Sequence, residues 1–300
     1  MFLQQLVNGL TIGAVYALIA VGYTMVYGII ELINFAHGEV YMIATFAAMT
    51  FFRMWGWPLW LAAPAAIMTA MILGVVIEYI AYRPLRRSPR LIALISAIGV
   101  SLFLQNLAMK LWGARRVPFL SLSQPLPFFQ LKHHVVLPWL GEATFSNMQV
   151  TILVTAAAIM LALQLIITRT KLGRAMRACA QDQVAAKLMG VNVDRTISAT
   201  FALGSGMAAV AGILVGMNYN QVWPMMGYMV GLKAFTAAVL GGIGNMPGAF
   251  VGGLVLGLAE GFAGAYVSSL WMDAVAFGIL ILVLIYRPSG LLGKLTPKRT

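Results

Sequence analysis

The sequence predicts an all-α, polytopic membrane protein with about eight transmembrane helices and additional short re-entrant or broken helices. Of its 300 residues, 61% are hydrophobic and only 9% are charged, and the mean hydropathy is +0.89. Soluble domains carry roughly 25% charged residues, so this composition excludes a soluble enzyme, a disordered tail and a secreted disulfide scaffold. The single cysteine, Cys179, has no partner for an internal disulfide. We expect residues 1–300 to form one membrane domain.

Long runs without a charged residue locate the membrane-spanning helices, because a helix needs about 20 apolar residues to cross a bilayer. The predicted spans are 3–30, 36–52, 59–81, 91–112, 148–168, 196–217 and 270–286. The region 231–267 is expected to start and end on the same side of the membrane. It contains either two crossings or, as we favour, a hairpin of short helices around the turn at 244–248. The first span has no basic segment before it and is interpreted as retained rather than cleaved.

Three clusters hold 14 of the 20 basic residues and indicate the orientation of the chain. They lie within 83–90, 169–195 and 287–299. Because positively charged loops face the cytoplasm, 169–195 is expected to be a cytoplasmic loop and 287–300 a basic cytoplasmic tail. The segment 113–147 lies between two spans whose other ends are basic, so it is expected to be an external loop. Its four prolines argue against regular helix there.

The first polar interruption, at 31–39, places Asn34, His37 and Glu39 between two apolar runs. Polar groups at membrane depth are costly and often functional. One interpretation is a broken helix whose free backbone groups face a solute pathway. The other is a cytoplasmic turn in which Asn34 caps the helix that carries Glu39. His37 and Glu39 are too few ligands for a metal site, and none is expected.

The second polar interruption, at 233–244, contains Lys233 and the glycines Gly241, Gly242 and Gly244. Glycine lets the backbone approach a ligand or another helix closely, so these four residues are candidates for the solute pathway. The glycines that follow, within 248–261, recur every four residues, which favours close helix packing in lipid.

Other polar residues in apolar runs are expected to contact protein rather than lipid. We expect this of Glu260 and Asp273. We expect the pair Gln105 and Asn106 to form hydrogen bonds between helices, and a place in the solute pathway is the alternative. The chain contains no G-x-x-x-x-G-K-[ST] motif, so it is not expected to hydrolyse ATP by that route or to be an enzyme. An intramembrane hydrolase built on Ser205 is a distant alternative, because such a nucleophile needs a nearby base.

The loop 169–195 is predicted to contain two short helices, at 173–180 and 184–190, in which apolar side chains alternate with charged ones. Such helices suit docking of a soluble partner, and the alternative is an amphipathic segment lying on anionic lipid.

Resemblance to a known family rests on the stretches 22–30, 33–39 (INFAHGE), 82–86, 91–99 and 233–244 (KAFTAAVLGGIG). They resemble the LivH/LivM family, the permease subunits of branched-chain amino-acid ABC importers, over essentially the whole chain and least in 113–147. The resemblance implies pairing with a homologous LivM-type permease, two cytoplasmic ATPases that use ATP and Mg, and an extracytoplasmic amino-acid-binding protein. It implies no cofactor on this chain, no nucleic acid, and a bacterial inner-membrane location among lipid.

Permeases of ABC importers carry an E-A-A-x-x-x-G coupling loop. Ala185, Ala186 and Gly190 match this pattern, whereas Val184 stands in place of the glutamate and the following Leu-Pro element is missing. The resemblance thus implies that 169–195 couples the chain to the ATPases. The candidate coupling residues are Gly173, Arg174, Arg177, Asp182, Ala185, Ala186 and Gly190.

The expected function is transport of branched-chain amino acids by alternating access. Related permeases carry urea or short amides, so these solutes and other amino acids remain alternatives. A channel or ion-coupled carrier that needs no ATPase is the rival class of function.

Overall fold

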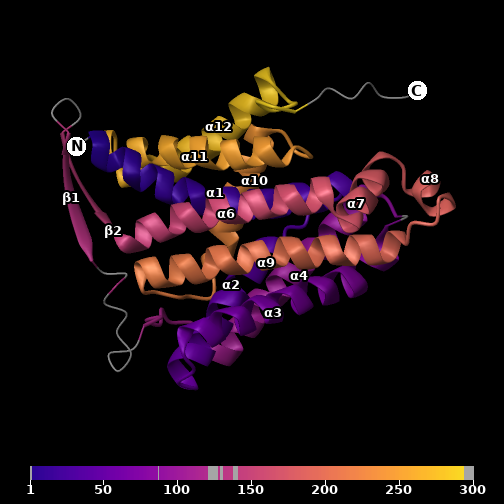
Figure 1. The fold of residues 1–300 in the computed structure, drawn as a ribbon, viewed down its shortest axis with the longest axis horizontal. Helices are drawn as coiled ribbons and strands as arrows, with labels where there is room; N and C mark the ends of the chain where they lie inside the picture. Colours follow the sequence, from indigo (N-terminus) through magenta and orange to yellow (C-terminus); the bar gives the residue numbers. More distant parts are fainter. Residues whose placement is uncertain (1, 87, 121–127, 129–130, 138–140, 294–300) are drawn as a thin grey trace.

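The computed structural model describes residues 2–86, 88–120, 128, 131–137 and 141–293, which form a bundle of helices that lie mostly side by side (Figure 1). Seven helices in these ranges are long and apolar enough to cross a membrane, which confirms the predicted polytopic all-α class. They are α1 (Phe2–Ile30), α3 (Leu59–Ile77, continued by turns to Leu85), α4 (Arg90–Trp112), α6 (Asn147–Arg169), α9 (Val193–Tyr219), α11 (Met246–Tyr266) and α12 (Met272–Tyr286, preceded by a turn from Ser269).

Four shorter helices complete the described helical part. They are α2 (His37–Met49, continued by a π-helical turn to Met54), α7 (Lys171–Gln181), α8 (Gln183–Leu188) and α10 (Met226–Gly241). Helices α7 and α8 confirm the two short helices predicted within 169–195. The segment 113–147 contains an antiparallel hairpin that was not predicted, in which β1 (Lys132–Leu137) pairs with β2 (Gly141–Ser146).

The two ends of the bundle differ. The hairpin and the N-terminus lie at one end, which we call the hairpin face, and α7 and α8 lie at the other, which we call the basic face (Figure 1). Arg287, the first residue of the predicted basic tail, lies at the basic face. Residues 294–300 of the tail lie outside the described residues. Ion pairs between Asp194 and both Arg83 and Arg86, each 2.6 Å long, join α9 to the end of α3 on the basic face.

Helix α1 forms the centre of the bundle because it is uncharged on every side. It is buried from Gly13 to Val26 and packs along α11. The contact depends on glycine, since a Cβ atom added at Gly257 would lie 2.6 Å from the carbonyl oxygen of Gly9. An added Cβ at Gly253 would lie 2.5 Å from Ala17 Cα. The predicted glycine packing is therefore confirmed, as an α1–α11 contact.

The region 231–267 forms two helices, α10 and α11, joined by a turn at 242–245. Helix α10 has 16 residues and is short, as expected, but α11 has 21 residues and is long enough to cross a membrane. The prediction that 231–267 is a hairpin of two short helices is therefore wrong for α11. Asn245 caps α11, accepting a 3.2 Å hydrogen bond from the Gly248 N–H, and contact with α1 supports α11 along its length.

The chain is interrupted inside the bundle at 31–36. A Cβ added at Gly22 would lie 2.5 Å from His37 Nε2, so α2 begins beside a point eight residues before the end of α1, about 12 Å along the helix axis. A Cβ at Gly38 would lie 2.9 Å from Gly231 Cα. The start of α2 thus meets the start of α10 within the bundle. A solute pathway along the interruption at 31–39 stays a prediction.

Candidate functional site

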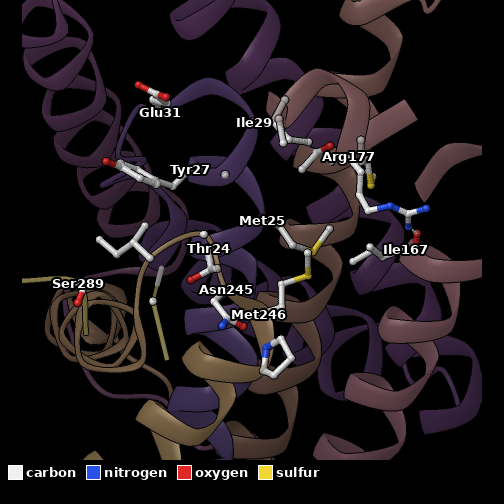
Figure 2. A pocket seen from close by; sticks show the side chains of 18 of the residues that line it. Thr24, Met25, Tyr27, Ile29, Glu31, Ile167, Arg177, Asn245, Met246 and Ser289 are labelled. Atoms are coloured by element: carbon white, nitrogen blue, oxygen red, sulfur yellow. Dashed lines mark hydrogen bonds between the residues drawn. The ribbon is translucent and has the colours of Figure 1, made fainter. Parts of the chain in front are cut away.

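A cavity of about 810 Å³ opens at the basic face, between the ends of α1, α6, α7 and α11 (Figure 2). Thr24, Met25 and Ile167 line it, together with Met176 of α7 and Asn245 at the start of α11. This mixture of apolar surface and a few polar groups is typical of sites for small molecules.

Two smaller cavities, of about 390 Å³ and 180 Å³, lie near the hairpin face. They share lining residues, among them Thr11 and Tyr219, and are therefore neighbours. The smaller one reaches Tyr16 of α1, whereas the cavity at the basic face reaches Thr24 of the same helix. The intervening turns of α1 are buried and span about 12 Å. Buried turns of α1 thus lie between two cavities that approach opposite faces.

Lys233 lies in the wall of the 180 Å³ cavity and forms two ion pairs. Its Nζ atom is 3.1 Å from Glu260 Oε1 and 2.6 Å from Asp273 Oδ1. Glu260 is fully buried and also accepts a 2.9 Å hydrogen bond from the Tyr16 hydroxyl. The expectation that Glu260 and Asp273 face protein is confirmed.

Asn34 and His37 are buried and line none of these three cavities. The Oδ1 atom of Asn34 accepts hydrogen bonds from the Ala36 N–H and the Tyr82 hydroxyl, both 3.1 Å long. The Asn34 side chain therefore caps the turn that leads into α2. It does not cap the first turn of α2 itself. The His37 ring lies 4.8 Å from that of Tyr23.

Glu39 is also buried away from the three cavities. Its Oε1 atom accepts hydrogen bonds from Ser101 Oγ at 3.1 Å and from Gln105 Nε2 at 2.8 Å. The predicted hydrogen bond between helices is confirmed at Gln105, whereas Asn106 donates to the Leu102 carbonyl within α4. No hydrogen bond or ion pair described in the structure connects these side chains of 31–39 with Lys233. No group of three metal-ligating side chains occurs within the described ranges.

The glycines at 241–244 lie at the basic face, away from Lys233. Gly242 has φ +104°, and a Cβ atom there would lie 2.5 Å from the Gly293 nitrogen, so Gly242 is required for packing against the C-terminal segment. Gly241 accepts a 3.1 Å hydrogen bond from the Leu292 N–H and approaches Gly248 closely. Only Gly244 of these three lines the cavity at the basic face.

The candidate coupling residues lie on and between α7 and α8. Asp182 caps α8, accepting hydrogen bonds from the N–H groups of Val184 (2.7 Å) and Ala185 (3.0 Å). Gly190 ends the segment with φ +84°. The remaining members have different surroundings: Gly173 packs against the backbone of 166–167, Arg174 and Ala185 are exposed, Arg177 donates to the Ile167 carbonyl, and Ala186 is buried.

Comparison with known proteins identifies the family. The profile of the family described as "Branched-chain amino acid transport system / permease component" matches residues 5–284. The chain belongs to this permease family. It is therefore a multi-pass membrane permease with a role in transport.

Similarity to individual members of the family extends over nearly the whole permease. It is 49% identical to the high-affinity branched-chain amino acid transport system permease protein LivH of Escherichia coli K12 over 98% of this chain and 96% of that protein. The identity and coverage are the same for the corresponding BraD protein of Pseudomonas aeruginosa. The xylose transport system permease protein XylH of Escherichia coli is 34% identical over 38% of this chain and 31% of that protein.

One contact in the permease was missed from the sequence. The Gln183 side-chain amide donates a 2.7 Å hydrogen bond to the Ile29 carbonyl, which joins the start of α8 to the end of α1. Ile29 and Met176 both line the cavity at the basic face. The coupling segment is therefore attached to the walls of that cavity. The only sequence feature that could have indicated a role for Gln183 is its position next to Asp182.

Proposed function

We propose that this permease is the membrane subunit of an ATP-driven importer of branched-chain amino acids in the bacterial inner membrane. The observation that carries this proposal is the similarity along nearly the full chain to LivH and BraD, both named for branched-chain amino acid transport. The similarity to a sugar permease covers a much smaller share of the chain. Leucine, isoleucine and valine are therefore favoured over urea, amides and other amino acids.

The proposed partners are a homologous LivM-type permease, two cytoplasmic ATPases that use ATP and Mg, and an extracytoplasmic amino-acid-binding protein. The basic face is the cytoplasmic side, as its arginine clusters indicate. Two cavities that approach opposite faces, with buried turns of α1 between them, suit alternating access. Helix α7 lines the cytoplasmic cavity, so an ATPase bound to 169–195 acts directly on its wall.

An ion-coupled carrier is the second candidate function, because Glu39 is buried and forms no ion pair with any residue described in the structure. Intramembrane carboxylates of this kind occur in proton relays. The carrier would transport solute without ATPase subunits.

Uptake of radiolabelled leucine into proteoliposomes separates the two functions. We expect uptake only when the complete complex is present with ATP on the side of the basic face. Accumulation of leucine by the purified chain under a proton gradient alone would overturn the proposal in favour of the carrier.

Met189→Glu tests the docking segment in the same assay. Met189 is 84% exposed at the end of α8, next to Leu188, as expected of a surface that a partner covers. Introducing a charge there should lower uptake and ATPase co-purification about tenfold. Met54→Glu is the matched control. Met54 is also exposed, but it lies at the end of the π-helical turn that follows α2 and not in the docking segment. Equal uptake by the two variants would contradict docking at α8.

A further inference from the structure

The 180 Å³ cavity near the hairpin face has both charged and aliphatic walls. Lys233 and Glu260 line it from α10 and α11, and the tyrosines Tyr16 and Tyr41 line it from α1 and α2. Its aliphatic surface is made by Ile12, Val15, Ile152, Val215 and Val230. Polar and apolar groups in one small enclosure indicate a ligand that has both kinds of surface.

The charges around Lys233 leave one carboxylate available. Lys233 contacts two carboxylates, Glu260 at 3.1 Å and Asp273 at 2.6 Å. The Asp273 side chain is half exposed, whereas that of Glu260 is fully buried. Asp273 alone can neutralise Lys233, so Glu260 can accept a second cation. A ligand ammonium group in the cavity would supply that charge without leaving a buried carboxylate unpaired.

Tyr41 indicates that the ligand also carries a negative charge. Its side chain is fully buried, and its hydroxyl has no hydrogen-bond partner among the residues that the structure describes. A buried hydroxyl without a partner is costly, and a Tyr O–H is a good donor to a carboxylate. The same cavity therefore offers two donors for an anion, the Tyr41 hydroxyl and the Lys233 ammonium.

The cavity is connected toward the hairpin face. It shares Thr11, Ile12, Asn218, Tyr219 and Met272 with the neighbouring 390 Å³ cavity. The additional lining of that larger cavity is largely polar and includes Gln5, Asn8, Gln149 and Ser269. A solute entering from this face thus passes a polar mouth before it reaches the aliphatic wall.

We propose that the 180 Å³ cavity is the binding site at which this permease receives a zwitterionic aliphatic amino acid from the hairpin face. The ligand carboxylate binds Lys233 and Tyr41, and its ammonium takes the place of Lys233 on Glu260. Its side chain contacts the aliphatic wall, while Asp273 keeps Lys233 in position. The site rests on the proposed function and assigns the substrate contacts to Lys233, Glu260 and Tyr41 rather than to Asn34, His37 and Glu39.

Photolabelling of the assembled complex in nanodiscs tests this site with photo-leucine, the diazirine analogue of leucine. We expect the label in peptides of α1 and α10 that contain Val15 and Val230. Excess leucine should suppress it, and neither 3-methylbutylamine nor 4-methylpentanoate, which each lack one charged group, should do so at the same concentration. Label confined to α3, α4, α7 or α8, which contribute no residue to the wall of this cavity, would overturn the site.

Two variants test the polar contacts. Tyr41→Phe removes a hydroxyl that has no described partner, so the fold should be unaffected, while labelling at a sub-saturating concentration falls about tenfold. Glu260→Gln should remove the preference for leucine over 4-methylpentanoate. Asp194→Asn is the control, because Asp194 is a half-exposed aspartate in ion pairs at the opposite face and should retain full labelling. Unchanged labelling and preference in both test variants would contradict the proposed contacts.

The assay is independent of transport. Labelling of α1 and α10 in a complex that takes up no leucine would leave the site standing and reject the proposed function. ATP-driven leucine uptake by a complex labelled elsewhere would reject the site and retain the function.

Discussion

Lys233→Met is expected to destabilise the folded permease by about 3–5 kcal/mol, the usual cost of removing one partner from a buried ion pair. Glu260 is fully buried, and the Lys233 ammonium is its cationic partner at 3.1 Å. Without the lysine, the hydrogen bond from Tyr16 is the only contact that Glu260 retains with a polar group of the described residues. The midpoint of thermal unfolding in detergent measures the effect.

The double variant Lys233→Met/Glu260→Gln separates charge from packing. It removes both charges, so it should recover most of the lost stability. Lys110→Met is the control, because Lys110 is exposed in the last turn of α4 and its loss should change the midpoint little. If Lys233→Met unfolds at the same temperature as the native chain, the ion pair does not stabilise the fold.

Gly257→Leu is expected to prevent α1 from packing on α11. A Cβ atom at this position would already lie 2.6 Å from the Gly9 carbonyl oxygen, and it would also collide with the backbone of Gly13. Backbone atoms cannot move aside as side chains can, so the cost should exceed the roughly 1–3 kcal/mol of ordinary overpacking. We expect little monodisperse protein in size-exclusion chromatography of a fluorescent fusion.

Gly99→Leu provides the matched control for this substitution. Gly99 also lies in a transmembrane helix, but a Cβ atom there would meet no atom of the described residues within 4 Å. Leucine has the better helix propensity by about 1 kcal/mol, so the Gly99 variant should fold at least as well as the native chain. Equal yields of the two leucine variants would show that the glycine contact does not determine the packing.

The sequence predicted those features that depend on local composition. Uncharged runs located the spans, and the spacing of Gly253, Gly257 and Gly261 predicted a helix contact, although not that α1 would be the partner. The extent of α11 was missed because its support comes from α1, more than 200 residues away in sequence. The hairpin in 113–147 was missed because a pair of short strands has a weak sequence signal.

The candidate site was harder to predict, because its residues come together only in the fold. Lys233 was identified as polar at membrane depth, but Glu260 and Asp273 were not recognised as its partners. Those two lie on separate helices, and the unpartnered hydroxyl of Tyr41 has no sequence signal at all. Asn34, His37 and Glu39 were grouped with Lys233 as pathway residues. The side-chain hydrogen bonds of Asn34 and Glu39 connect them instead to Tyr82 at the end of α3, to α4 and to the turn before α2.

The importer account depends on the basic face lying in the cytoplasm, where ATPases reach α7 and α8. Native Cys179 is buried, and burial raises the pKa of its thiol, so it contributes little background to thiol labelling. Cysteines can therefore be introduced at two exposed positions, Leu188→Cys in α8 and Lys132→Cys in β1 on the hairpin face.

Labelling of these two variants with a membrane-impermeant maleimide in sealed, right-side-out vesicles tests the orientation directly. The account predicts that Lys132→Cys reacts at once and that Leu188→Cys reacts only after the vesicles are permeabilised. Rapid labelling of Leu188→Cys in intact vesicles would place the coupling segment outside the cell and contradict the account.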